Sequence, residues 1–266
     1  RRVVEGQPKF RWIQAIYSGG RIRSLPTTFR ATIVLWFALL LGKTETIYLV
    51  CSRSEGGFLR DVPALLPAVF GTRVIVHAHG SDIVDLLRRG RLSALARWLY
   101  RRCELIVPSE HLVPLLEGVD LKKLYVCENF ALQNKETAID PQPSQKPSLD
   151  LLWNSNVMSS KGFFDVADSV AVARSNGHDV RFTSLGECLG DNEKTSTQVT
   201  AELDRLIDQP WFTYLGRVTP DCAVQQTAKA DVVVLPSRYK SECQPLALIQ
   251  AMSFGKTIII ADTPAL

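Results

Sequence analysis

The stretch ADVVVLPSRYKSECQPLALIQAMSFGKTIII, residues 230–260, decides the fold class. Residues 232–235 form an apolar run of strand length, a polar loop with Glu242 follows, a helix is predicted from about Pro245, and a second strand from Thr257. This order predicts a parallel α/β sheet, in which ligands bind at the carboxyl ends of the strands. Helix N-termini favour phosphate, so Glu242 is placed where a carboxylate would meet the hydroxyl groups of a phosphate-bearing ligand.

The same alternation of strands and helices runs through most of the chain. A polar stretch with three prolines, residues 131–148, has the composition of a linker. We therefore predict two doubly wound α/β domains, residues 1–130 and 149–266, facing across a cleft. Strands are predicted at residues 46–51, 73–78, 105–107, 124–127, 149–153, 180–185, 212–216, 232–235 and 257–260. Helices are predicted near residues 82–89, 92–103, 109–117, 162–175, 198–208, 220–229 and 245–254.

Composition indicates packed cores, since 46% of the 266 residues are hydrophobic. The longest apolar run, residues 31–42, is about half of the roughly 20 residues that a membrane span needs, and it is predicted to be a buried helix. The six cysteines form no CxxC or zinc spacing, which favours free thiols in a reducing, cytoplasmic compartment. No signal peptide is seen, and a true start before Arg1 is expected to be missing.

Charge is distributed unevenly. Residues 1–130 carry 19 Lys/Arg and 11 Asp/Glu, a net charge of +8, whereas residues 131–266 carry 12 and 16, a net charge of −4. The basic excess, which includes Arg88, Arg97 and Arg101, is interpreted first as a solvated helix face. The alternatives are a surface for anionic lipid or for a lipid-phosphate acceptor. Nucleic acid is disfavoured because no recognised binding motif is present.

The segment that opens this section resembles the donor-binding signature of the family 4 retaining glycosyltransferases, PS…E-G-x-x-x-x-x-x-E-A-M-x-x-G-x-P-V-I. Three positions depart from that pattern: Cys243 replaces Gly, Thr257 replaces Pro, and Gln250 replaces the second acidic residue. A hydrogen bond to a charged group contributes about 1.5–3 kcal/mol against roughly 1 kcal/mol for a neutral one, so Gln250 predicts weaker donor binding. Over the rest of the motif this chain reads Pro236, Ser237, Glu242, Gln244, Pro245, Ala251, Met252 and Gly255, ending in Ile258 and Ile259.

The resemblance implies a GT-B fold with two Rossmann-like domains, both incomplete in this chain. It also implies transfer of a sugar from a nucleotide-diphosphate sugar, most simply a UDP-sugar, to a glycan or lipid-linked acceptor with retention of configuration. In that reaction no cofactor or metal is expected, and no DxD-type motif is evident. Lys161 would neutralise the leaving diphosphate, and Glu242 would hold the donor sugar.

Several further residues are assigned to the donor side. Lys161 and Gly162 form a strand-to-helix turn, a phosphate site by charge and geometry. The resemblance places Asn156 where the family has a basic residue, and Gly186 where the nucleotide approaches the backbone. Arg217 is a weaker candidate for the diphosphate. The remaining donor-binding candidates are Cys243, Gln244, Pro245, Leu246 and Gln250.

In the first domain the segment VIVHAHGSD ends a strand. His79 is the catalytic candidate, because it lies nearer the carboxyl end than His77, and the resemblance favours His79, Gly80, Ser81 and Asp82 on the acceptor side. The alternative is that Ser81 and Asp82 simply cap the next helix, as Ser109 is expected to do further along. Glu128 and Asn129 resemble the strand end that precedes the linker in the family.

Three functions stay open. The first is a glycosyltransferase, peripheral at the inner face of the cell membrane and acting in polysaccharide synthesis. The second, favoured by Gln250, is a nucleotide-sugar or glycan-binding module without turnover. The third is a related nucleotide-sugar epimerase. A Rossmann dehydrogenase is disfavoured, because no GxGxxG follows an early strand.

Overall fold

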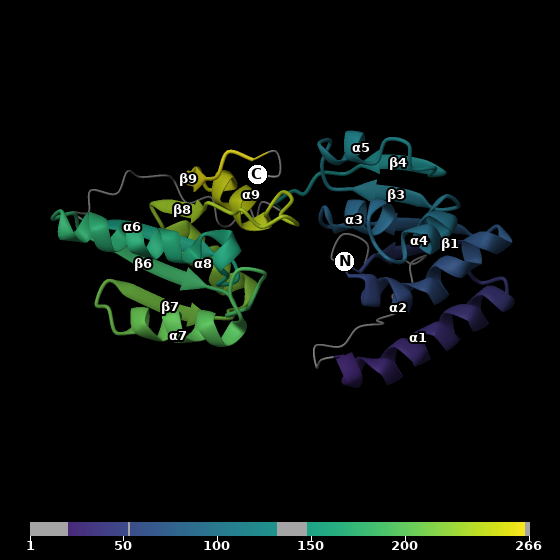
Figure 1. Ribbon diagram of the computed structural model, residues 1–266, viewed down its shortest axis with the longest axis horizontal. Coiled ribbons are helices and arrows are strands. Elements are labelled where there is room, and N and C mark those ends of the chain that lie inside the picture. Colours follow the sequence, from purple (N-terminus) through teal and green to yellow (C-terminus); the bar gives the residue numbers. More distant parts are fainter. Residues whose placement is uncertain (1–20, 53, 132–147, 264–266) are drawn as a thin grey trace. The chain divides into compact units, whose positions relative to one another are not determined.

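The computed structural model describes residues 21–52, 54–131 and 148–263 (Figure 1). The chain divides into two compact units, residues 1–127 and 128–266. Each contains one sheet in which all pairings are parallel, as predicted. Of the predicted linker, residues 132–147 lie outside the described part of the chain.

The first unit is built on a four-stranded sheet with the order β1-β2-β3-β4. Its four strands agree with the predicted runs to within one residue, because each is a short run rich in apolar residues, a local signal that is readable from the sequence. The strands are β1 (Thr46–Val50), β2 (Arg73–His77), β3 (Glu104–Val107) and β4 (Lys123–Val126). The helices are α1 (Arg21–Leu40), α2 (Glu55–Leu65), the 3-10 helix η1 (Leu66–Phe70), α3 (Asp82–Arg88), α4 (Ser93–Tyr100) and α5 (Leu112–Leu115).

Helix α2 was not predicted. Two glycines in its first turn, Gly56 and Gly57, and Pro63 inside it weaken the helical signal. The start was nevertheless readable, because the Ser54 hydroxyl accepts a hydrogen bond from the Gly57 N–H and Glu55 follows in the first turn.

Two predicted caps are wrong. The helix expected at residues 109–117 covers only Leu112–Leu115, and the Ser109 hydroxyl pairs with Nδ1 of His111 at 2.9 Å instead of capping. Pro114 lacks a backbone N–H, which shortens the helix. Likewise α3 begins at Asp82, and the Ser81 side chain makes no capping hydrogen bond, because Ser81 itself has helical backbone angles.

The helix expected at residues 31–42 exists, as part of α1, but it is not buried as predicted. It packs on α2 along one stripe, where Ala31 and Ala38 are buried and the Trp36 indole donates to the Pro63 carbonyl at 3.1 Å. Phe29, Ile33, Phe37 and Leu40 form another stripe and are 52–81% exposed. Among the described residues, no helix combines the length and hydropathy that a bilayer crossing requires.

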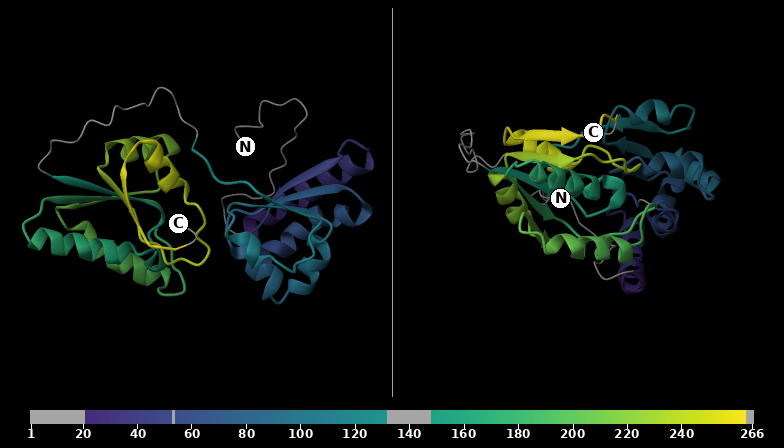
Figure 2. Two further views of the ribbon diagram at one scale, coloured as in Figure 1. Left: turned by 90° about the horizontal axis from the view of Figure 1, so that it is seen from above. Right: turned by 60° about the vertical axis from the view of Figure 1, so that its left-hand side comes forward.

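The second unit contains a five-stranded sheet with the order β7-β6-β5-β8-β9. The chain runs outward from β5 in one direction and then returns to continue in the other, so β5 and β8 flank a topological switch point. Figure 2 shows the strands between helices on both faces. The strands are β5 (Leu149–Asn154), β6 (Val180–Leu185), β7 (Phe212–Gly216), β8 (Val232–Leu235) and β9 (Thr257–Ile260). The helices are η3 (Ser159–Lys161), α6 (Phe163–Ser175), α7 (Ser196–Ile207), α8 (Pro220–Lys229) and α9 (Leu246–Ser253).

An aromatic core fixes this sheet. The Phe163 ring, at the start of α6, lies 5.2–6.1 Å from the rings of Trp153, Phe182 and Phe212, which come from three adjacent strands. Phe163, Trp153 and Phe182 are fully buried. Because Phe163 follows Lys161 and Gly162 directly, this packing also fixes the turn that carries the predicted phosphate ligand.

Candidate active site

Two loops of the second unit meet at the switch point. One, residues 155–162, leaves the carboxyl end of β5, and the other, residues 236–245, leaves the carboxyl end of β8. They approach closely because Gly162 has no side chain: a Cβ there would lie 2.8 Å from the Pro236 carbonyl oxygen, and its φ of +82° also favours glycine. The Arg238 N–H donates to the Ser160 carbonyl at 2.8 Å, which ties the loops together.

The meeting of the loops brings Lys161 and Glu242 into contact. The Lys161 ammonium lies 3.0 Å from Oε2 of Glu242, with the two side chains 13% and 12% exposed. The ammonium also donates to the Ser155 hydroxyl at 2.9 Å, and the Ser237 hydroxyl donates to Oε2 of Glu242 at 3.1 Å. The Tyr239 ring centroid lies 5.8 Å from the ammonium, within cation–π range.

These contacts leave two groups for a ligand. An ammonium has three N–H donors, and two of those of Lys161 are used within the protein. Oε2 of Glu242 accepts two hydrogen bonds, whereas Oε1 has no partner among the described residues. The pair therefore offers one charged donor and one charged acceptor side by side, which suits an anion next to a hydroxyl group.

The Glu242 loop is held mainly through its backbone and its apolar members. Cys243 is buried, and burial, followed by the nearby Glu242 carboxylate, raises the pKa of its thiol to about 11. A side chain therefore fits at this position, although the family commonly has glycine there. Pro245 precedes α9, and Leu246 in its first turn is 61% exposed.

Gly186 is needed here by the protein's own backbone. A Cβ at this residue would lie 2.2 Å from the Ser155 carbonyl oxygen, and its φ is +108°. The contact between these two strand ends by itself requires glycine at this position, and the approach of a nucleotide to Gly186 stays a prediction. Beside it, Oδ1 of Asn156 accepts from the Glu187 N–H at 3.1 Å, and the exposed Arg217 forms an ion pair with Glu187 at 2.9 Å.

Gln250 lies on α9 facing α8. Its Oε1 is 3.5 Å from the hydroxyl oxygen of Thr227, which is fully buried. That hydroxyl donates its single hydrogen to the Ala223 carbonyl at 2.8 Å, so the weak Thr227 contact leaves the amide of Gln250 largely available.

His79, Gly80, Ser81 and Asp82 belong to the first unit. The rings of His77 and His79 lie 4.5 Å apart, as expected for two residues on one face, and Nδ1 of His77 is hydrogen-bonded to the Tyr48 hydroxyl. Burial, helped by the nearby His79, lowers the pKa of His77 to about 4, so His77 is neutral at pH 7.

The second unit thus brings together Lys161, Glu242 and the loop Cys243–Leu246, with Asn156, Gly186 and Arg217 on the neighbouring strand ends. Sequence reasoning did not assign site roles to Ser155 and Ser237, which orient the ion pair. Ser237 stands in the Pro-Ser pair of the recognised motif, so it could have been found; Ser155 had no comparable signal.

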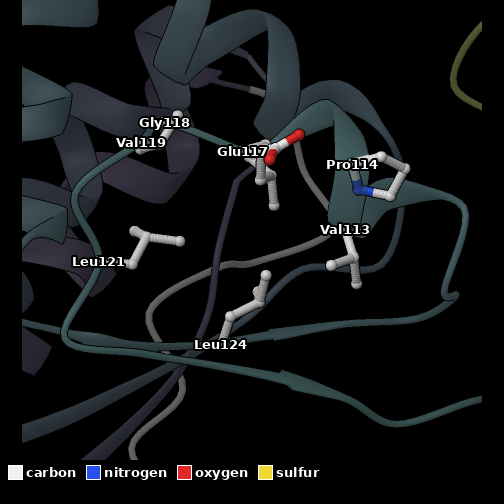
Figure 3. Close-up of a pocket in the computed structure, with 8 residues that line it drawn as sticks. Val113, Pro114, Glu117, Gly118, Val119, Leu121 and Leu124 are labelled. Carbon is white, nitrogen blue, oxygen red and sulfur yellow. The ribbon is translucent and has the colours of Figure 1, made fainter.

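A separate cavity of about 510 Å³ in the first unit holds none of the predicted site residues (Figure 3). It lies between α5, β4 and the turn that joins them, and apolar side chains dominate its lining: Val113, Pro114, Leu116, Val119, Leu121 and Leu124, with Glu117 and Gly118. Across residues 21–52, 54–131 and 148–263, no three His, Cys, Asp or Glu side chains are close enough to share a metal ion.

Comparison with known proteins agrees with this fold, and a family model matches the part of the chain that carries the candidate site. Residues 149–266 match the family model described as "Glycosyl transferases group 1". Among solved structures, the Anabaena protein Alr3699/HepE in complex with UDP and glucose superposes with a TM-score of 0.62 at 16% identity, over 94% of this chain and 66% of its own. The likeness to this structure shows the fold, and the α/β architecture with two parallel sheets is as predicted.

Two other solved structures resemble the chain to a similar degree. Sucrose-phosphate synthase from Thermosynechococcus elongatus has a TM-score of 0.60 at 15% identity, over 94% of this chain and 65% of its own. A glycosyltransferase from Rickettsia africae ESF-5 has a TM-score of 0.62 at 11% identity, over 94% and 66%. The chain therefore spans about 66% of the length of these structures. A search of curated proteins finds no match.

Proposed function

We propose that the chain is part of a metal-independent, retaining glycosyltransferase of family 4. It would move a sugar, most simply a hexose, from a nucleotide-diphosphate sugar to a glycan or lipid-linked acceptor. One observation carries the proposal: Lys161 and Glu242 lie 3.0 Å apart at the switch point, with one donor and one acceptor atom left for a ligand. The matching domain and the UDP bound to the Anabaena neighbour support a UDP-sugar as co-substrate, and no other cofactor is proposed.

The chemistry follows from the charges. When the bond between the anomeric carbon and the diphosphate breaks, negative charge grows on the leaving phosphate. The remaining N–H of Lys161 and the first amides of α6 would stabilise that charge without reorganising, which is usually the largest catalytic contribution. Oε1 of Glu242 would accept a sugar hydroxyl, holding the donor while the acceptor hydroxyl attacks from the face that the diphosphate leaves. His79 is proposed on the acceptor side.

The test is calorimetric titration of the 266-residue chain with UDP-glucose, together with an assay for released UDP. We expect binding that Lys161→Ala weakens by about tenfold or more, since a charge-assisted hydrogen bond contributes about 1.5–3 kcal/mol. Absence of binding to UDP-, GDP- and ADP-glucose by the wild-type chain would refute the proposal.

A second candidate is a nucleotide-sugar-binding module without turnover, favoured by Gln250 in place of an acidic residue. Binding of UDP-glucose with no UDP release at any acceptor concentration would support it. Conversion of the donor sugar with no acceptor present would instead indicate an epimerase.

We further propose cytoplasmic location with peripheral contact to an anionic membrane surface, in polysaccharide synthesis. The support is α4, on which Trp98 is 39% exposed and Arg97 is exposed, with the exposed Arg101 directly after its last residue. A helix with an aromatic side chain and basic residues on its exposed face suits a lipid interface. Co-sedimentation with phosphatidylglycerol vesicles, reduced in Arg97→Glu/Arg101→Glu, is the expected result.

A further inference from the structure

Gln244 has an unusual backbone. Its φ is +44°, and it is the only residue other than glycine with a positive φ among those that the structure describes. A side-chain-bearing residue in this left-handed region costs about 1–2 kcal/mol, and it persists only where the surroundings hold it. Gln244 lies two residues after Glu242, in the loop that carries the candidate site, so the source of this constraint bears on the site.

The constraint comes from Glu128 and Asn129, the first residues of the second unit. The Asn129 backbone N–H donates to Oε1 of Gln244 at 2.8 Å, and Nδ2 of Asn129 donates to the Gln244 carbonyl at 2.9 Å. Nε2 of Gln244 then donates to Oε1 of Glu128 at 3.1 Å. Every polar group of the Gln244 side chain is therefore engaged.

The orientation of both amides follows from chemistry. A backbone N–H can only donate, so the Gln244 atom facing it must be the oxygen; a backbone carbonyl can only accept, so the Asn129 atom facing it must be the nitrogen. The carboxylate of Glu128 can only accept, which agrees with the Gln244 nitrogen facing it. The three hydrogen bonds are mutually consistent without any free choice of amide flip.

These bonds anchor the carboxyl-terminal end of the loop 236–245, beyond the ion pair of Lys161 and Glu242. The start is tied to Ser160 through the Arg238 N–H, and the middle is tied by a turn in which the Glu242 N–H donates to the Tyr239 carbonyl at 3.0 Å. Two residues before Asn129, at the end of the first unit, the Cys127 N–H donates to the Val107 carbonyl at 2.9 Å. The segment that connects the units is thus bonded to the loop that bears Glu242.

We propose that Asn129 is a positioning residue for this loop: by holding Gln244 in the left-handed conformation, it directs the Glu242 carboxylate toward Lys161 and the donor sugar. The assignment rests on the proposed function of the Lys161–Glu242 site. It has a reciprocal consequence, because a ligand that stabilises the loop must also stabilise the hydrogen bond from the Asn129 N–H. Binding of a nucleotide-sugar would therefore stabilise the hydrogen bond that the connecting segment makes through Asn129.

The experiment compares UDP-glucose affinity of the full 266-residue chain in four forms: wild type, Asn129→Ala, the double variant Asn129→Ala/Gln244→Gly, and the control Asn176→Ala, an exposed asparagine of the same unit. We expect about tenfold weaker binding for Asn129→Ala, from the loss of an amide hydrogen bond and of the loop geometry it holds. The double variant should recover about threefold, because glycine adopts the left-handed region without help. The control should equal wild type.

Affinity within twofold of wild type for Asn129→Ala, or no recovery in the double variant, overturns the proposal. A general loss of stability would not be rescued by glycine at 244, so the recovery separates positioning from folding. Thermal unfolding of each variant confirms that it is folded.

Hydrogen exchange provides a second readout that does not need a ligand. Asn129→Ala should speed exchange of the Glu242 N–H, and in the wild type UDP-glucose should slow exchange of the Asn129 N–H. If the wild type binds no nucleotide-sugar, the proposed function fails, and exchange at Glu242 alone then decides the positioning role: unchanged exchange overturns it, and faster exchange supports it.

Discussion

The carboxyl ends of β5 and β8 in the second unit and those of β1 and β2 in the first differ in their electrostatics, although both edges belong to parallel sheets. In the second unit an ammonium and a carboxylate lie 3.0 Å apart and mostly buried. In the first, two imidazole rings lie 4.5 Å apart beside Tyr48, and the pKa of His77 is lowered to about 4. One edge is built around fixed opposite charges on two loops and the other around a neutral imidazole at a strand end, so two edges of the same parallel architecture differ in what they can bind.

The largest expected effect is on sugar transfer, and it comes from Lys161 at the carboxyl ends of β5 and β8. Lys161→Met keeps most of the side-chain volume but removes the ammonium, and we expect transfer to fall by about a hundredfold to a thousandfold, the usual result of deleting one preorganised donor to developing charge. The measurement is kcat with UDP-glucose as donor in the complete protein. Lys229→Met, at an exposed position in the last turn of α8, is the control, and wild-type turnover in Lys161→Met would contradict the role of Lys161.

The second prediction concerns the backbone contact beneath that edge. Gly186→Ala would place a Cβ 2.2 Å from the Ser155 carbonyl oxygen, and we expect a loss of about 3 kcal/mol or more in the free energy of unfolding. Gly177→Ala is a matched control, since Gly177 also has a positive φ, +88°, but open space around it. It should cost only about 1–2 kcal/mol. Equal losses in urea unfolding would show that conformation alone requires glycine at 186.

The third prediction concerns the neutral side chain of Gln250 in the second unit. Gln250→Glu should tighten binding of UDP-glucose about fivefold, because a charged acceptor contributes more than a neutral one. Gln250→Ala should weaken it about fivefold, from the loss of roughly 1 kcal/mol. Titration calorimetry measures both. Weaker binding in Gln250→Glu would indicate that the neutral amide is the better partner of this chain's ligand.

The smallest expected effect is a pH dependence of the free energy of unfolding that arises from His77 in the first unit. The pKa of His77 is about 4 in the folded chain, below the ordinary value of 6.5, so the unfolded chain binds the proton more readily. The stability that neutral His77 contributes is complete above about pH 6.5 and is lost as the pH falls through about 4. Urea unfolding of wild type and His77→Gln at pH 7 and pH 5 should show a smaller decrease in the variant.

His178→Gln, an exposed histidine of the second unit, serves as the control for that comparison. A wild-type slope in His77→Gln would mean that His77 is not the source of the acid sensitivity and that the first edge is less shielded from water than its geometry indicates.

The sequence by itself determined the parallel α/β class, the positions of the strands and the two loops of the donor side. Apolar runs of strand length and helical periodicity are local signals, and a Lys-Gly turn and a Pro-Ser…Glu segment are readable as they stand. It missed α2, because two glycines weaken its helical signal. It also predicted capping by the side chains of Ser81 and Ser109, neither of which makes a capping hydrogen bond.

Only the tertiary structure decided how distant residues meet. Four features join residues about thirty or more positions apart. They are the strand order that brings the ends of β5 and β8 together, the contact of Gly162 with Pro236, the contact of Gly186 with Ser155, and the hydrogen bonds between Asn129 and Gln244. The same holds for the exposed stripe of α1, whose composition alone indicated burial. Local propensity fixes the conformation of a segment, but which surface faces water and which side chains share a charge depend on the packing of the whole unit.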